Sequence, residues 1–294
     1  MAHYSIKDLE KLSGIHAHTI RIWEKRYQLV KPMRTATNIR VYSDEDLKRL
    51  LNVAVLNKNG LKISKIARLN DNDLNNKIIQ LSSDMSNTDS QIESLVIGMI
   101  ELDEEKFEHL IQKLVDEIGF ENTIVKIVYP FLVKIGVLWQ TGNIQPAQEH
   151  FVSNIIRKKL FTAIDELGAS KKNSKYKFLL FLPEGEFHEI SLLFYAYLVK
   201  KQGYNGIYLG QSVPFTDLES IQKTYNADFM VTSLVTNLQD ITVVDYIKKL
   251  SKAFKKNKLY IAGQLVANVD IKRGSNVVKL KSPEHFKELL QKLK

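Results

Sequence analysis

The sequence predicts a multidomain protein with three parts: a small all-α helix-turn-helix domain, a four-helix bundle, and an α/β domain built on a parallel sheet. Two short helical patterns joined by a glycine open the chain. Apolar residues then recur with a helical period, and short apolar strands finally alternate with helices. We expect domains at residues 1–75, 91–170 and 171–294, with a linker at residues 76–90.

Length and composition narrow the function classes. The chain has 294 residues, 44% of them hydrophobic, a formal net charge of +9 and no cysteine. The positive charge favours an anionic partner such as nucleic acid. Without cysteine, a disulfide framework, a thiolate metal site and a thiol nucleophile are excluded. The sequence has no signal-peptide pattern and no apolar run long enough to span a bilayer, so we expect a cytoplasmic protein with no membrane partner.

A helix-turn-helix is expected at the amino terminus. Residues 5–13 form the first predicted helix, with Ser5 as its N-cap. Gly14 permits the turn, because glycine tolerates the left-handed conformation that ends a helix. A second helix is expected over about residues 16–27, and Pro32 stops any continuation beyond it.

The second predicted helix has an inner and an outer face. Ile20 and Trp23 face inward, while Arg21, Lys25 and Arg26 project outward. Residues 38–42 then alternate in polarity as a hairpin strand does, and would form a wing. Ser43 is expected to cap a third helix, with acidic residues in its first turn.

These motifs resemble the MerR-type winged helix-turn-helix over residues 1 to about 70. Residues 19–24 read Thr-Ile-Arg-Ile-Trp-Glu, and residues 40–42 read Arg-Val-Tyr in the predicted wing. The resemblance implies a double-stranded DNA operator as partner. It implies that the following residues meet the DNA: Arg21, Lys25, Arg26, Arg40 and Tyr42. The alternative, that these are surface charges on a small helical domain, stays open.

The middle of the chain predicts a four-helix bundle. Helical apolar spacing also occurs over residues 61–80, before polar breaks. Beyond the linker, the spacing and the Gly and Pro breaks predict four further helices, at about residues 90–101, 104–118, 121–140 and 146–166.

A Trp-x9-Glu-His spacing joins the last two predicted helices. Trp139 ends one of them, and Glu149 and His150 lie in the first turn of the next. The region resembles the helical cap of cobalamin-binding modules, and more closely that of MerR-type, adenosylcobalamin-dependent light sensors. The resemblance implies that Trp139 covers the upper face of the corrin and that Glu149 and His150 contact its upper ligand. Gln140 stands where the light-sensing relatives often carry histidine.

The carboxy-terminal part predicts a Rossmann-like, flavodoxin-like domain, because strands and helices alternate. The expected strands are residues 177–182, 206–209, 229–234, 259–262 and 277–280. The expected helices follow residue 188 and cover residues 217–225, 240–256 and 284–293. Ligands bind at the carboxyl ends of parallel strands, where the loop of residues 183–188 would lie.

This loop carries Glu186 and His188. Cobalt accepts an imidazole, and a ligating histidine usually donates its other N–H to a carboxylate, a role that Glu186 could take. The loop resembles the acidic-x-His motif of corrinoid-binding modules, which makes His188 the lower ligand of cobalt. The resemblance extends to further cofactor contacts at Thr232, Leu234 and Gly263. It departs from the family pattern at two glycine positions, which Ser191 and Ala262 occupy.

Together these patterns predict a regulator rather than an enzyme, because no nucleophile-base-orienter set is present. We expect a transcriptional repressor whose oligomeric state, a homodimer or homotetramer, and operator affinity depend on adenosylcobalamin and on light. Two alternatives stay open. One is a MerR-type regulator that keeps the fold and binds no cobalamin. The other is a corrinoid carrier protein that serves a methyltransferase.

Overall fold

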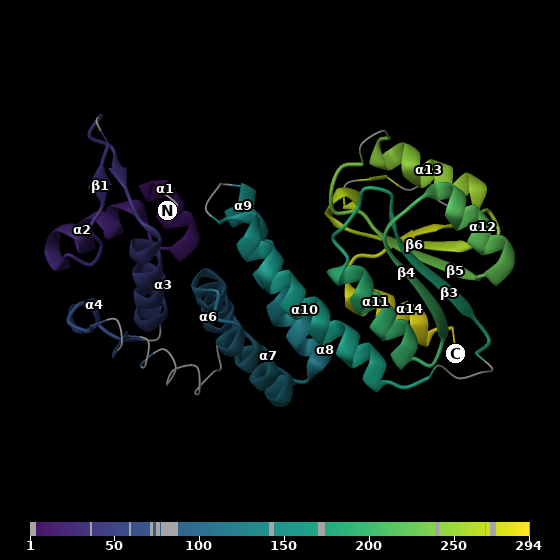
Figure 1. The fold of residues 1–294 in the computed structure, drawn as a ribbon, viewed down its shortest axis with the longest axis horizontal. Helices are drawn as coiled ribbons and strands as arrows, with labels where there is room; N and C mark the ends of the chain where they lie inside the picture. The colour runs from purple at the N-terminus through teal and green to yellow at the C-terminus, as the bar shows by residue number, and fades with distance from the viewer. Residues whose placement is uncertain are drawn as a thin grey trace. The chain divides into compact units, whose positions relative to one another are not determined.

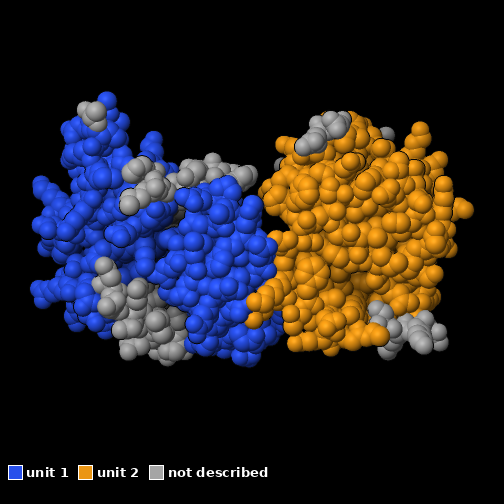
Figure 2. All heavy atoms as spheres, in the orientation of Figure 1, with its two compact units in different colours: residues 1–155 blue, residues 156–294 orange. Residues whose placement is uncertain are grey.

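The computed structural model describes residues 4–35, 37–58, 60–70, 73–74, 77, 88–140, 144–169, 174–238, 241–267, 269–270 and 275–293. The chain divides into two compact units, an amino-terminal unit of residues 1–155 and a carboxy-terminal unit of residues 156–294 (Figure 2). Among the described helices, none combines the length and the apolar character needed to cross a membrane.

The first two helices follow the predicted order. Helix α1 spans Ile6–Ser13 and α2 spans Ala17–Tyr27 (Figure 1). The Ser5 hydroxyl accepts the Asp8 amide at 3.3 Å, and the Asp8 carboxylate accepts the Ser5 amide at 2.8 Å, which satisfies two amides at the helix start. Gly14 follows α1 with φ 68°. The predicted cap and turn are therefore confirmed.

The end of α2 agrees with the prediction. The helix ends at Tyr27 as expected, and Gln28 follows it in the left-handed conformation (φ 51°). The expected strand over residues 38–42 is shorter, at Arg40–Val41 (β2), and pairs antiparallel with Met33–Arg34 (β1), which was not predicted. Helix α3 spans Asp44–Lys58, and the Ser43 hydroxyl accepts the Asp46 amide at 3.1 Å, as expected.

Helical spacing is expected over residues 61–80, and part of this segment is described. Helix α4 spans Ile63–Ile66, and residues 73–74 and 77 are also helical. The predicted linker lies mostly outside the described residues, and its last three positions belong to helix α6, which spans Thr88–Glu101.

The helices expected for the bundle are present. The second is α7, Glu104–Ile118, and the fourth is α10, Pro146–Glu166. The third is continuous but not uniform: α8 (Phe120–Thr123) passes through a π-helical turn η1 (Ile124–Val128) into α9 (Tyr129–Gln140). Their bounds lie within about two residues of the predicted ones.

The carboxy-terminal unit holds a five-stranded sheet in the order β4-β3-β5-β6-β7. Its strands are β3 (Lys177–Pro183), β4 (Asn205–Val213), β5 (Phe229–Ser233), β6 (Lys258–Ala262) and β7 (Val277–Lys279). Each neighbouring pair is parallel, so the predicted parallel sheet is confirmed.

Helices cover both faces of this sheet (Figure 1). They are α11 (Ile190–Lys201), α12 (Phe215–Tyr225), α13 (Val243–Ala253) and α14 (Pro283–Gln291). On one face, Leu218 of α12 and Leu250 of α13 pack into an apolar core with the strands. On the other, Phe286 of α14 stacks edge-on against Tyr195 and Tyr260. The helices cover the faces of the sheet, and the loops that follow the strands lie at its carboxyl edge.

Candidate functional site

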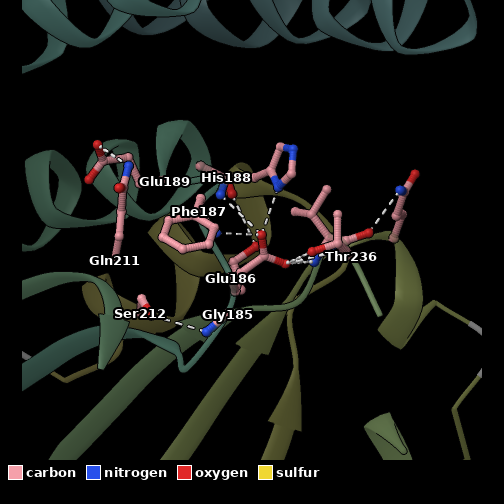
Figure 3. Close-up of polar contacts among 12 residues, drawn as sticks. Gly185, Glu186, Phe187, His188, Glu189, Gln211, Ser212 and Thr236 are labelled. Carbon is pink, nitrogen blue, oxygen red and sulfur yellow. Dashed lines mark hydrogen bonds and ion pairs between the residues drawn. The ribbon is translucent and has the colours of Figure 1, made fainter. Parts of the chain in front are cut away.

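The candidate site lies where the strand order of the sheet reverses. Strand β3 lies between β4 and β5 in the sheet. The loops that follow β3 and β5 therefore run in opposite directions from the carboxyl edge, which is the usual ligand position in such sheets. The loop after β3 carries Glu186 and His188, and the loop after β5 carries Thr236 (Figure 3). Val235 precedes Thr236 in the loop after β5.

The Glu186 carboxylate joins the two loops. It is fully buried, and its Oε1 accepts the amides of Phe187 and His188 at 3.0 Å each and His188 Nδ1 at 2.7 Å. Its Oε2 accepts the amides of Val235 and Thr236 at 2.8 Å each and the Thr236 hydroxyl at 3.1 Å. Both oxygens are therefore saturated with donors.

These donors keep Glu186 ionised. Burial alone raises the pKa of the carboxyl, but the hydrogen bonds from His188, Thr236 and Val235 outweigh it and lower the pKa to about 2. The site thus holds a fixed negative charge against the imidazole of His188.

Acid is expected to weaken the fold through this carboxyl. The pKa of Glu186 lies at about 2 in the folded chain, against an ordinary value of 4.5. A lowered pKa gives stability that is complete above the ordinary value and is lost as the pH falls toward the folded value. The difference corresponds to about 3 kcal/mol of unfolding free energy.

Urea unfolding at pH 7, 5, 4 and 3 measures this effect when the wild-type protein is compared with Glu186→Gln. The variant should lack most of the loss that the wild type shows below pH 4.5. Parallel pH profiles for the two proteins would contradict the assignment.

The His188 ring is suited to hold a metal. Its side chain is 51% exposed. When Nδ1 carries the proton and donates it to Glu186, Nε2 carries the lone pair, as in histidines that ligate metals. Within the described residues, no three His, Asp or Glu side chains gather as a metal site. The pair of His188 and Glu186 supplies one oriented imidazole, which fits a metal that brings most of its ligands with it, as cobalt does in a corrin.

The other residues predicted for this edge lie deeper. Thr232 and Leu234 are buried at the end of β5, and the Thr232 hydroxyl has no hydrogen-bond partner in the described part of the chain. Gly263 has φ 107°, and a Cβ there would lie 2.1 Å from the Leu234 carbonyl oxygen, so this position requires glycine. That these three contact a cofactor stays a prediction.

The two side chains that replace family glycines are also placed. Ser191 Oγ lies 3.1 Å from Ser233 Oγ, which joins the first turn of α11 to the end of β5. Ala262 is buried at the end of β6. Both lie at the carboxyl edge of the sheet, next to Ser233 at the end of β5.

The residues predicted above the corrin belong to the amino-terminal unit. Trp139 and Gln140 are the last two residues of α9. Glu149 and His150 lie in the first turn of α10, with Glu149 Oε2 3.7 Å from His150 Nε2. His188 belongs to the carboxy-terminal unit, and a joint role of the two groups stays a prediction.

The residues predicted to contact DNA fall into two groups. Arg21, Lys25 and Arg26 are exposed on α2. Arg40 Nε instead donates to both carboxylate oxygens of Glu24 at 3.1 Å, and the buried Tyr42 donates its hydroxyl to Glu24 Oε2 at 3.3 Å.

Tyr42 is held as a hydrogen-bond donor. Burial, followed by the Glu24 carboxylate, raises the pKa of Tyr42 to about 12. The structure thus brings Arg40 and Tyr42 together around Glu24, at the base of the hairpin. DNA contact stays a prediction for all five residues.

Sequence reasoning missed a second buried carboxylate beside His188. Glu189 is 7% exposed and is held by Arg157 of α10 and by Tyr208 and Gln211 of β4. The signal available in the sequence was an acidic residue directly after the candidate ligand, in a segment that is otherwise apolar.

Two family models match the amino-terminal part and the helical middle of the chain. Residues 4–73 match the family described as MerR HTH family regulatory protein, and residues 91–163 match the family described as B12 binding domain. The chain is 26% identical over 259 residues to the HTH-type transcriptional repressor CarH of Myxococcus xanthus, covering 86% of each chain. It is 26% identical over 242 residues to the repressor CarA of the same organism, covering 78% of this chain and 76% of CarA.

A solved structure supports the fold. The monomethylamine corrinoid protein of Methanosarcina barkeri superposes with a TM-score of 0.57 at 14% identity, over 71% of this chain and all of that one. The parallel sheet with its helices is thus of the kind found in a corrinoid protein. The chain combines a MerR-type helix-turn-helix domain with a B12-binding domain, and it is a homologue of the CarH and CarA repressors.

Proposed function

We propose that the chain is a DNA-binding transcriptional regulator, acting as a repressor, whose operator affinity is controlled by cobalamin. The observation that carries the proposal is the Glu186–His188 pair, set at the reversal of strand order in a chain that also has a MerR-type domain. A corrinoid carrier is less supported, because a carrier has no use for the exposed basic helix α2.

Each part of the site has a role in this proposal. His188 would be the lower ligand of cobalt, and Glu186 would fix its tautomer while Val235 and Thr236 hold Glu186 in place. Trp139, Glu149 and His150 would lie on the side of the upper ligand. Bound adenosylcobalamin would supply a cobalt–carbon bond that light can break.

The first test is the visible spectrum of the purified protein with cobalamin. His188→Ala is expected to shift the spectrum to the form without a protein imidazole, because the ring is the proposed ligand. His109→Ala, which removes an exposed histidine of α7, is the matched control and should leave the spectrum unchanged. A spectrum of His188→Ala identical to that of the wild type would remove the ligand assignment.

Replacing Glu186 should change the visible spectrum less than His188→Ala does, because Glu186 orients the proposed ligand and does not bind cobalt itself. Glu186→Ala is expected to reduce cobalamin affinity by about 10–100-fold, as for other groups that orient a ligating histidine. If the wild-type protein binds no cobalamin at all, the alternative hypothesis is favoured, in which a MerR-type regulator keeps the fold but does not bind the cofactor.

Adenosylcobalamin is expected to change operator affinity through oligomer size. A ligand shifts the equilibrium between two oligomeric states only when it binds them with different affinities. The bulky upper group of adenosylcobalamin would reach Trp139, whereas a hydroxo ligand would not. Linkage then requires the operator to tighten adenosylcobalamin binding by the same factor. Trp139→Ala should uncouple the two.

Light scattering and operator binding, measured in parallel, test this coupling. The samples are the apo protein, the protein with adenosylcobalamin in the dark, and the same sample after green illumination. Equal mass and equal operator affinity in all three would exclude the switch and leave a regulator that does not respond to the cofactor.

A further inference from the structure

Glu189 forms a buried cluster that the proposed cobalt site does not use directly. Its Oε1 accepts Gln211 Nε2 at 2.6 Å (Figure 3). The same oxygen accepts Arg157 Nη1 at 3.2 Å, and its Oε2 accepts a hydrogen bond from the Tyr208 hydroxyl. The side chain of Glu189 is 8% exposed, whereas that of Arg157 is 32% exposed. The cluster is therefore an ion pair whose acidic end is buried.

The donors come from two different elements. Tyr208 and Gln211 lie on β4, and Arg157 lies on α10. A buried carboxylate is tolerated only when it is paired and hydrogen-bonded, and these three side chains meet that need together. Burial, followed by the Glu189 carboxylate, raises the pKa of Tyr208, so its hydroxyl stays a donor. Glu189 is thus hydrogen-bonded to side chains of both β4 and α10.

His188 lies between two such anchors. Glu186 fixes one side of the ligand loop to the segment after β5, and Glu189 fixes the other side to β4 and α10. The anchors are three residues apart, and the Glu189 amide donates to the Phe187 carbonyl at 3.0 Å. A shift of Glu189 therefore turns the peptide that carries His188 relative to Glu186.

We propose that Glu189 is a positioning residue for His188. Through the ion pair of Glu189 with Arg157, the position of the His188 ring on Glu186 depends on helix α10. The role in cofactor binding rests on the proposed function, in which His188 ligates cobalt. The positioning itself is a property of the protein without cofactor. Helix α10 also carries Glu149 and His150 in its first turn. The ion pair between Arg157 and Glu189 therefore connects the helix that bears these two residues to the loop that bears His188.

The first arm of the test uses the full-length protein without cofactor. Nitrogen NMR of protein labelled at histidine reports the tautomer of each ring, and His188→Asn identifies the signal of His188. In the wild type, His188 should show the tautomer with hydrogen on Nδ1. In Arg157→Met and in Glu189→Gln, the signal should become a mixture of both tautomers, because the ring loses its fixed position on Glu186.

Two further variants separate positioning from general damage. Lys159→Met removes another cation of α10 that lies near Arg157 in sequence and should leave the tautomer unchanged. Arg157→Lys keeps the cation and should restore the wild-type signal in part. An unchanged His188 tautomer in both Arg157→Met and Glu189→Gln would overturn the proposal, and so would an equal change in Lys159→Met.

The second arm adds cobalamin to the same proteins. Arg157→Met should lower the fraction of cobalamin with a protein imidazole ligand and reduce affinity by about tenfold, at the lower end of the range for groups that orient a ligating histidine. If wild-type protein binds no cobalamin, the proposed function fails while the first arm still decides the positioning role. If cobalamin binds with an unchanged spectrum in Arg157→Met, the link from α10 to the ligand is wrong.

Discussion

Glu186→Gln is expected to lower the free energy of unfolding by about 3–5 kcal/mol, although the two side chains have nearly the same shape. Every group that contacts the Glu186 carboxylate is a donor. A glutamine must turn its NH2 group toward one set of these donors, either the amides of Phe187 and His188 or those of Val235 and Thr236. Two or more buried N–H groups then lose their acceptor.

Urea unfolding at pH 7, followed by circular dichroism, measures this loss. Glu184→Gln is the matched control, because Glu184 lies in the same loop but is exposed, and its change should stay within about 0.5 kcal/mol. A Glu186→Gln protein as stable as the control would mean that the hydrogen bonds around this carboxylate do not support the fold.

Replacing Arg21, Arg26 and Arg40 together by alanine is expected to reduce operator affinity by at least about a hundredfold. Each interaction with a base edge or phosphate contributes about 1–3 kcal/mol, and three such losses add when the sites are independent. The slope of log affinity against log salt should also fall by about one for each phosphate that the variant no longer neutralises. Arg40→Ala also removes the cation that is paired with Glu24, so that the Tyr42 hydroxyl remains as a donor to that carboxylate.

The measurement is a titration of a fluorescent duplex from the region upstream of the protein's own gene, at several salt concentrations. Lys252, Lys255 and Lys256 provide the control, since they are exposed and lie in or just after α13, in the carboxy-terminal unit. Their triple alanine variant removes the same charge and should bind almost as the wild type does. Equal losses in the two triple variants would show that net charge alone drives the binding.

The site was predictable where its chemistry is local in sequence. Glu186 and His188 are two residues apart in one loop, and the apolar run before them predicts the strand that ends there, so their contact at 2.7 Å follows from spacing. The helices of residues 88–166 and the parallel strands were predictable for a similar reason. Each has an apolar period long enough to be distinguished from its neighbours.

The parts that were not predicted depend on distant residues or on single backbone angles. Arg157 and Gln211 lie 32 and 22 residues from Glu189, and nothing in their neighbourhoods singles them out. β4 continues to Val213 through Gly210 and Ser212, which have φ 83° and 50°, where the sequence suggested that the strand had ended. Gln28 ends α2 in a conformation that its residue type does not signal.

The π-helical turn at Ile124–Val128 lets the third helix hold one extra residue. Its i→i+5 hydrogen bonds close over one residue more than the α-helical ladder would, so the extra residue is absorbed within the turn. Deleting one residue from this turn would therefore restore an unbroken α-helix and leave α9, including the backbone of Trp139, at the same position around the helix axis. The same deletion within α9, where no wide turn absorbs it, would rotate the residues that follow by about 100°. Homologues that lack the extra residue would align with this chain across a one-residue gap at the turn.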